Sequence, residues 1–370
     1  MQDWLAQRTR AFDVSGIRKF FDLGAKMRDP INLSIGQPDF DVPEEVKQAA
    51  ITAIREGRNG YALSQGMPVL RDKLQARVES RFGHADREVF VTCGTSGGLV
   101  LAMMALVDPG DEVILPDPCF GMYNALAAMM GGRVVSIDTY PDFHLDPQRV
   151  AEAITPRTKL ILVNSPNNPT GAVATREELR AIAELAAERN VALLSDEIYH
   201  DFCYDEPCVS PAEFNPQTIV VDGFSKSHGM PGWRLGFAHG PAAVIHEMIK
   251  IQQYSFVCAP QPVQWAGAAA MEVDISGHID AYRRKRDMIV EGLRDHYELI
   301  CPRGAFYAFP KAPWGSGTEF CMQALEGHKL LVVPGGNFSR QDSHFRISYA
   351  ASDPVLHRGI KALVELARKE

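Results

Sequence analysis

One lysine lies in a glycine-rich segment where it could do covalent chemistry with a carbonyl compound. Lys226 is part of GFSKSHGMPGWRLG (residues 223–236), with Ser225 directly before it and Arg234 eight residues later. A neutral amine attacks an aldehyde to form a Schiff base, but a free lysine is protonated near neutral pH and needs its pKa lowered. The planar guanidinium of Arg234 matches a phosphate. The segment therefore predicts a site for a carbonyl compound that also carries a phosphate.

A second candidate for phosphate binding lies nearer the N-terminus. The sequence VFVTCGTSGGLVLAMMALV (residues 89–107) predicts a short apolar strand, a turn of small residues and an apolar helix. In this order the free backbone N–H groups and the helix dipole point into the turn and attract an anion. The same small residues also let a strand and a helix pack closely, so the turn alone leaves both interpretations open. The candidate donors are Gly94, Thr95 and Ser96.

Polar and aromatic side chains follow the ends of other apolar strands. Asp196 ends the strand VALLSD, where a carboxylate is costly unless it is paired, and a protonated ring nitrogen is a suitable partner. Asn168 and Tyr199 could donate hydrogen bonds to a phenolate oxygen, and Phe120 could stack on a ring face. A phosphate, a protonated ring nitrogen, a phenolate and an aldehyde together describe pyridoxal 5′-phosphate (PLP), whose ring accepts electrons.

The elements expected to position these residues define an α/β fold. Between residues 87 and 240, short apolar strands alternate with amphipathic helices, which favours a mostly parallel sheet with helices on both faces. Such sheets bind ligands at the carboxyl ends of their strands. We expect an N-terminal arm (1–42), a large domain (43–275) and a C-terminal α+β domain (276–370). The arm is expected to pack with the C-terminal part, which makes the smaller domain discontinuous.

Composition excludes several classes of partner. The chain has 370 residues, 46% of them hydrophobic, and a net charge of −8, which gives no electrostatic case for nucleic acid or an anionic membrane. Its seven cysteines are scattered without metal-ligand spacing, so no metal site is predicted and reduced thiols are expected. The chain shows neither a signal-peptide pattern nor an apolar run of about 18 residues. These features favour a cytoplasmic protein without a membrane partner.

The motifs taken together resemble the class I and II aminotransferases of PLP fold type I. SKSHGMPGWRLG resembles the lysine segment of that family, SPNNPTG its NPTG turn, and SDEIY its aspartate–tyrosine strand. FRISYA (345–350) resembles the C-terminal segment that contains an arginine, and IGQPDF and YALSQGMPVLRDKL also match. The motifs occur in the family's order over nearly the whole chain.

The resemblance implies a role for each cofactor residue. Lys226 is the lysine that bonds the PLP aldehyde and then moves a proton as general base and acid. Asp196 keeps the ring nitrogen protonated, Asn168 and Tyr199 face the ring oxygen, and Phe120 stacks on the ring. Phosphate contacts are assigned to Gly94, Thr95, Ser96, Ser225 and Arg234.

The resemblance also implies substrate contacts and a homodimer. Arg346 is expected to hold the α-carboxylate of an amino acid or 2-oxo acid, with Asn168 beside it. Gly36 is expected to let the substrate approach the backbone closely, and Ile17 to line the pocket. In the family the tyrosine that matches Tyr61 reaches the phosphate of the neighbouring subunit, which implies active sites shared between two copies.

Two kinds of enzyme and one non-enzymatic class share these motifs. We expect an aminotransferase with glutamate and 2-oxoglutarate as one pair and an aromatic, aliphatic or aspartate partner. Some aspartate-using members have a lysine where this chain has Ser96, which weakens the aspartate assignment. Another PLP enzyme of the same fold, such as a carbon–sulfur β-lyase, would share the cofactor residues. A PLP-binding transcription regulator would carry a basic domain ahead of the motifs, yet they begin by residue 31.

Overall fold

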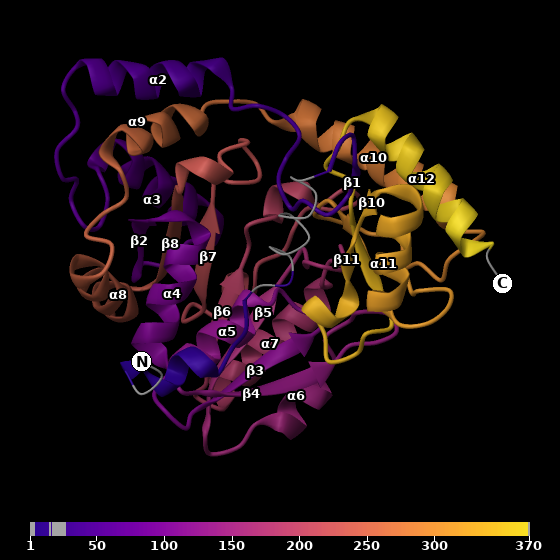
Figure 1. The fold of residues 1–370 in the computed structure, drawn as a ribbon. Helices are drawn as coiled ribbons and strands as arrows, with labels where there is room; N and C mark the ends of the chain where they lie inside the picture. The colour runs from indigo at the N-terminus through magenta and orange to yellow at the C-terminus, as the bar shows by residue number, and fades with distance from the viewer. Residues whose placement is uncertain (1–3, 15, 17–26, 369–370) are drawn as a thin grey trace.

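The computed structural model describes residues 4–14, 16 and 27–368, and its centre is one seven-stranded sheet (Figure 1). The strand order is β2-β8-β7-β6-β5-β3-β4. Only β8 runs antiparallel to its neighbours, so the sheet is mostly parallel, as predicted. The strands are β2 (Arg87–Thr92), β3 (Glu112–Asp117), β4 (Arg133–Asp138), β5 (Thr158–Asn164), β6 (Ala192–Asp196), β7 (Ile219–Gly223) and β8 (Gly236–Pro241).

Helices cover both faces of the sheet because consecutive strand residues point to opposite sides. In β5, Leu160 and Leu162 pack with α4, α5 and α8, whereas Ile161 and Val163 pack with α6 and α7. Helix α3 covers the β2 end, and α2 and α9 pack outside it. The bounds are α2 (Glu44–Arg55), α3 (Pro68–Phe82), α4 (Gly94–Leu106), α5 (Met122–Met129), α6 (Pro147–Ala153), α7 (Arg176–Glu188), α8 (Ala242–Tyr254) and α9 (Gln261–Ala270). This arrangement confirms the predicted α/β class.

The C-terminal part forms smaller sheets that also use the start of the chain. Strand β1 (Ile31–Asn32) pairs in parallel with β10 (Leu330–Leu331). A second sheet has the antiparallel order β11-β12-β9, and three helices pack beside it (Figure 1). These elements are β9 (Tyr307–Ala308), β11 (Val333–Pro334), β12 (Phe345–Ser348), α10 (Ser276–Leu293), α11 (Gly317–His328) and α12 (Asp353–Ala367). The domain limits at residues 42 and 275 stay a prediction.

The sequence WRLGFAHG (residues 233–240) predicts a strand that follows the lysine segment, but the observed strand is shorter. Strand β8 begins only at Gly236, because residues 231–233 form a 3₁₀ turn and Arg234 adopts a left-handed backbone with φ of 56°. A left-handed residue cannot continue an extended strand. The turn directs Arg234 toward the start of α4.

Two glycines let the first turn of α4 lie directly against the strands. Gly223 of β7 pairs with Gly236 of β8. A Cβ atom on Gly236 would be 2.5 Å from the backbone nitrogen of Thr95, and one on Gly223 would be 2.8 Å from the Thr95 Oγ1 atom. Side chains at either position would therefore push the α4 N-terminus away from the strand ends.

The packing at Gly236 gives a stability prediction. Replacing Gly236 with Ala should lower the free energy of unfolding by about 1–3 kcal/mol, because the added methyl group meets backbone atoms that cannot move independently. Urea unfolding followed by circular dichroism measures this change.

The matched control is Gly277→Ala in the first turn of α10, where an added Cβ has no atom within 4 Å. This change should be neutral or slightly stabilising, since alanine favours helix over glycine. Equal unfolding free energies for the two variants would contradict the proposed close packing.

Candidate active site

A cavity of about 260 Å³ collects most of the predicted site residues at the carboxyl ends of β5, β6 and β7. The predicted residues that line it are Gly36, Thr95, Ser96, Phe120, Asn168, Asp196, Tyr199, Ser225, Lys226, Arg234 and Arg346. Segments that are far apart in sequence thus meet at one place, where open parallel sheets bind ligands.

Three other predicted residues lie elsewhere. Gly94 is not part of the lining but lies against Arg234, because a Cβ there would be 2.6 Å from the Arg234 Nη2 atom. Tyr61 is 87% exposed and does not line this cavity. Ile17 lies outside the described residues.

The amine of Lys226 is inside the cavity in a setting that favours its neutral form. Its Nζ donates a hydrogen bond to the Gly36 carbonyl oxygen at 2.6 Å. Burial lowers the pKa of Lys226 to about 8, and repulsion from Arg346 and Arg234 acts in the same direction, whereas Asp196 opposes it. The sequence indicated that Lys226 needs a lowered pKa to be nucleophilic, and this environment provides it.

Asp196 is a buried carboxylate held by two donors. Its Oδ2 atom accepts from the Tyr123 hydroxyl at 2.8 Å, and Oδ1 accepts from the Ile198 backbone at 3.2 Å. Burial raises the pKa of Asp196 to about 6, although both hydrogen bonds lower it in part. A buried carboxylate of this kind is stabilised by a cationic ligand group such as a protonated ring nitrogen.

Tyr123 and Ile198 also line the cavity, although no role was predicted for either. Tyr123 follows Phe120 by three residues at the start of α5, a spacing that places two side chains on the same side of a helical turn. Ile198 follows Asp196 by two residues, the spacing of side chains that share one side of an extended chain. Both signals are present in the sequence.

Arg346 is a buried guanidinium in which one nitrogen has no hydrogen-bond partner. Its Nη1 atom donates to Asn168 Oδ1 at 2.9 Å, and Nη2 donates to the Ser34 carbonyl oxygen at 2.7 Å. The Nε atom is buried without a partner, and the two hydrogen bonds that Arg346 makes to the described residues go to an amide oxygen and a backbone carbonyl, neither of which is a carboxylate. Because a buried cation is costly without a counter-charge, this geometry fits a carboxylate ligand.

The first turn of α4 provides an anion site. Thr95 Oγ1 is buried without a hydrogen-bond partner. Ser96, Ser225 and Arg234 line the cavity together with Thr95. The N–H groups of a helix start have no partners within the helix. With the guanidinium of Arg234 beside them, they suit the phosphate of a cofactor.

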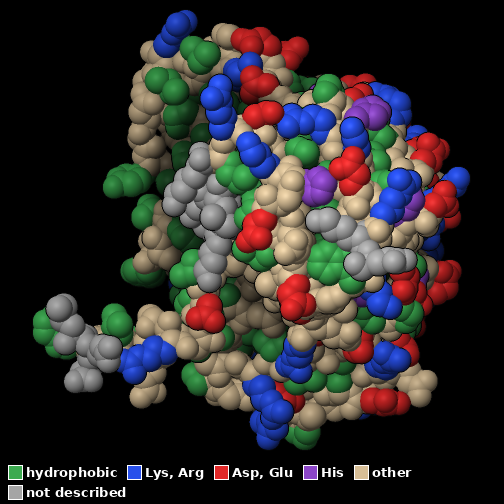
Figure 2. All heavy atoms as spheres, turned by 45° about the vertical axis from the view of Figure 1, so that its right-hand side comes forward, with side chains coloured by type: hydrophobic (Ala, Val, Ile, Leu, Met, Phe, Trp, Pro, Cys, Tyr) green, Lys and Arg blue, Asp and Glu red, His purple; other side chains and the backbone are tan. Residues whose placement is uncertain are grey.

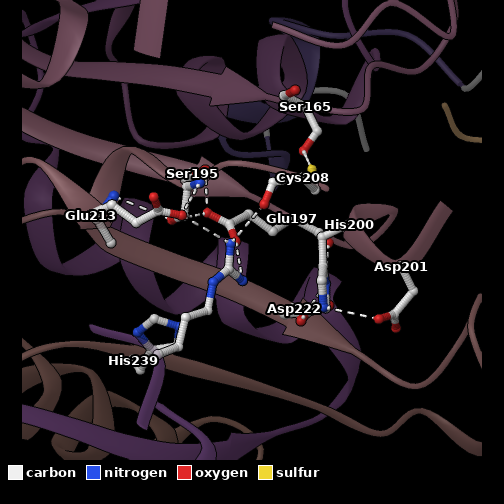
Figure 3. Close-up of polar contacts among 12 residues, drawn as sticks. Ser165, Ser195, Glu197, His200, Asp201, Cys208, Glu213, Asp222 and His239 are labelled. Carbon is white, nitrogen blue, oxygen red and sulfur yellow. Dashed lines mark hydrogen bonds and ion pairs between the residues drawn. The ribbon is translucent and has the colours of Figure 1, made fainter. Parts of the chain in front are cut away.

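A second polar layer is formed by residues at and after the end of β6, around Glu197 and His200 (Figure 3). Glu197 accepts hydrogen bonds from the hydroxyls of Ser195 at 3.0 Å and Ser210 at 2.5 Å. His200 lies between the carboxylates of Asp222 and Asp201, at 3.0 and 3.1 Å. Burial disfavours the charged imidazole, yet the two carboxylates outweigh it and raise the pKa of His200 well above its ordinary value. The layer is therefore internally paired rather than open to a ligand.

Within residues 4–14, 16 and 27–368, no three histidine, cysteine or acidic side chains are arranged to hold a metal ion. In the same part of the chain, no helix is both long and apolar enough to cross a bilayer.

The environment of Lys226 predicts its chemical reactivity. In the cofactor-free protein, alkylation of Lys226 by a small neutral electrophile should rise with pH around a midpoint near 8, because only the neutral amine reacts. Peptide mass spectrometry measures the rate at each pH, with the exposed Lys159 as an internal control for the reagent. Arg346→Gln should move the midpoint upward by removing a repelling charge. A midpoint near that of an ordinary lysine, 10.5, would rule out the buried environment.

Comparison with known proteins places this site in a family. The profile of the family described as aminotransferase class I and II matches residues 28–363. A probable aspartate aminotransferase of Methanocaldococcus jannaschii is 36% identical over 98% of this chain and 99% of its own length. An aspartate/prephenate aminotransferase of Thermus thermophilus is 39% identical over 98% of each chain.

Solved structures agree with the sequence relatives. The aspartate aminotransferase of Thermus thermophilus with maleate aligns with a TM-score of 0.94 and 36% identity, over 98% of this chain and 99% of that one. An aspartate aminotransferase of Thermotoga maritima aligns with a TM-score of 0.92 and 32% identity. With the matched profile spanning most of its residues, the chain belongs to the class I and II aminotransferases, a family of PLP-dependent enzymes.

Proposed function

We propose that this chain binds PLP and uses it to move an amino group between an L-amino acid and a 2-oxo acid. The observation that carries the proposal is one cavity in which the Lys226 amine, with a pKa of about 8, lies among a buried carboxylate, an anion site and a buried guanidinium. Each of these groups suits one part of the cofactor or of an amino acid.

The cavity residues fit PLP group by group. Asp196 would hold the ring nitrogen, Asn168 and Tyr199 the ring oxygen, and Phe120 one face of the ring, with Ile198 also in the lining. The phosphate would be bound by Gly94, Thr95, Ser96, Ser225 and Arg234. When bound, PLP supplies an electron sink that makes the Cα proton of an amino acid acidic.

The chain's own residues bind the substrate and move the proton. Arg346 holds the α-carboxylate and fixes the orientation of the Cα–H bond, a positioning effect. Lys226 then takes that proton at Nζ and returns it as general base and acid. With a pKa of about 8, roughly one Lys226 amine in ten is neutral at pH 7, against about one in three thousand for an ordinary lysine. The lowered pKa thus raises the reactive fraction several hundredfold.

We propose glutamate and 2-oxoglutarate as one substrate pair, with an aromatic, aliphatic or aspartate partner. Relatives named for aspartate, prephenate and aromatic amino acids support this range. The cations in the described cavity lining are Lys226, Arg234 and Arg346, and each already has a proposed partner. A side-chain carboxylate, whether of glutamate or of aspartate, would therefore need a cation from outside this lining, such as one from a second copy of the chain.

A half-reaction tests the function. PLP-loaded protein mixed with glutamate alone should release 2-oxoglutarate in an amount equal to the active sites, and the visible absorption of the cofactor should change with the same time course. A panel of aspartate, phenylalanine and leucine then identifies the second substrate. Lys226→Ala should lower turnover by at least about a thousandfold, because it removes both the covalent partner and the proton carrier.

Other outcomes separate the alternatives. Continuous release of pyruvate and ammonia from a thioether amino acid, without a second oxo acid, would instead establish the carbon–sulfur β-lyase. Full activity of Lys226→Ala, in protein that unfolds at the same temperature as the parent, would overturn the proposed chemistry altogether.

We also propose that two copies share their active sites. Tyr61, Leu63, Tyr254 and Phe256 are exposed apolar side chains, and the two segments that carry them are joined by a hydrogen bond from Gln252 Nε2 to the Ser64 carbonyl oxygen. Exposed apolar residues gathered in this way favour a protein interface. The face drawn in Figure 2 differs from such a surface, since acidic and basic side chains are interspersed over it.

A mixing experiment tests the shared sites. Tyr61→Ala should bind PLP more weakly, and Lys226→Ala should be inactive. In a mixed dimer, the site that keeps Lys226 receives Tyr61 from the other copy, so mixing the two variants should restore activity. Sedimentation velocity checks that the parent is a dimer. Activity that stays at the sum of the separate variants would place Tyr61 in its own site or outside any site.

A further inference from the structure

Tyr307 connects the two halves of the cavity, although no role was expected for it. It belongs to β9, lines the cavity and is 1% exposed. Its hydroxyl lies 2.8 Å from that of Tyr199, which follows the end of β6 in the large sheet by three residues. Its ring lies against the guanidinium of Arg346, with the Arg346 Cζ atom 4.5 Å from the ring centroid. One side chain thus touches both the proposed ring-oxygen residue and the proposed carboxylate residue.

The direction of the hydrogen bond between the two hydroxyls follows from their surroundings. Each tyrosine has a single proton to donate. If Tyr199 donates its proton to the cofactor's ring oxygen, its oxygen can still accept one from Tyr307. The positively charged guanidinium of Arg346 lies over the Tyr307 ring and stabilises negative charge on that phenol. The Tyr307 hydroxyl is therefore a better hydrogen-bond donor than the Tyr199 hydroxyl. The other charged groups near this pair are Lys226, whose Nζ is 5.9 Å from the Tyr199 ring centroid, and Asp196.

The position of the Tyr307 hydroxyl is fixed by packing. A Cβ atom on Gly36 would be 2.6 Å from this oxygen, so a side chain at Gly36 would displace it. The backbone of Tyr307 is held by antiparallel strand pairing with Ser348 in β12, two residues beyond Arg346. The hydroxyl therefore has little freedom to turn away from Tyr199.

We propose that Tyr307 is a positioning residue: its hydroxyl donates to Tyr199 and directs the Tyr199 proton to the cofactor's ring oxygen, while its ring supports Arg346. The proposal rests on the proposed PLP-dependent function. It adds a residue that links the place where the substrate carboxylate binds to the residue that adjusts the cofactor's electronic state. A chain of two hydrogen bonds strengthens the second donor, because each bond polarises the next.

The test compares three variants in the PLP-loaded protein. Tyr307→Phe removes the hydroxyl but keeps the ring beneath Arg346, and Tyr199→Phe removes the direct donor. The control is Tyr297→Phe, which loses a buried hydroxyl that donates to the Leu363 carbonyl oxygen, outside the cavity. The readout is the pH midpoint of the change in visible absorption of the bound cofactor, with thermal unfolding of each variant as a check on folding.

A donor to the ring oxygen stabilises its anion and so favours loss of the proton that the bound cofactor carries. Tyr199→Phe should therefore raise the midpoint, and Tyr307→Phe should raise it by a smaller amount, about half a unit or threefold in the proton equilibrium. Tyr297→Phe should leave it unchanged. For Tyr307→Phe, kcat should fall about three- to tenfold with a smaller change in KM, because the ring under Arg346 remains.

A double variant checks the geometry. Gly36→Ala should raise the midpoint by displacing the Tyr307 hydroxyl, and it should add nothing further in the Tyr307→Phe protein. An unchanged or lowered midpoint in Tyr307→Phe, beside a raised one in Tyr199→Phe, would refute the role of Tyr307 and leave the proposed function intact. A parent protein that shows no visible band with PLP would refute the proposed function and, with it, this inference.

Discussion

The burial of like charges in one cavity is the constraint on which the rest of the site depends. Lys226 and the buried Arg346 share the lining with a single carboxylate, Asp196, and the more exposed Arg234 adds a third cation at its edge. Removing charged groups from water is costly unless they are paired, and here the protein leaves the pairing incomplete. The consequences are a lowered pKa for Lys226 and a raised pKa for Asp196. In the proposed function, a ligand that brings a phosphate, a ring cation and a carboxylate would complete the pairing that folding leaves open.

The fold supplies these charges from separate elements and holds them with short-range contacts. Asp196 comes from the end of β6, Arg346 from β12 and the phosphate turn from the start of α4. Gly223 and Gly236 let that turn lie against the strands. The mostly parallel sheet aligns the strand ends, so each side chain needs only a local turn to reach the common cavity.

Much of this arrangement was predictable, because local patterns encode it. Strand periodicity predicted the mostly parallel sheet, and motif resemblance predicted Lys226 and Asp196, which the structure brings together in one cavity. Tyr307 was missed because its neighbours, Tyr199 and Arg346, are distant in sequence and only tertiary packing brings them to it. The start of β8 was placed too early because nothing in the residue types signals that Arg234 is left-handed.

The unpaired Nε atom of Arg346 has a consequence for which amines the enzyme accepts. Two of the guanidinium nitrogens are already bonded within the protein, whereas Nε has no partner. A primary amine without a carboxylate would bury this cation with no counter-charge, whereas an α-amino acid supplies one at a fixed distance from its amino group. With Arg346 in its proposed role, the cavity would distinguish amino acids from biogenic amines by charge balance rather than by size, and a wide range of side chains would be compatible with that selection.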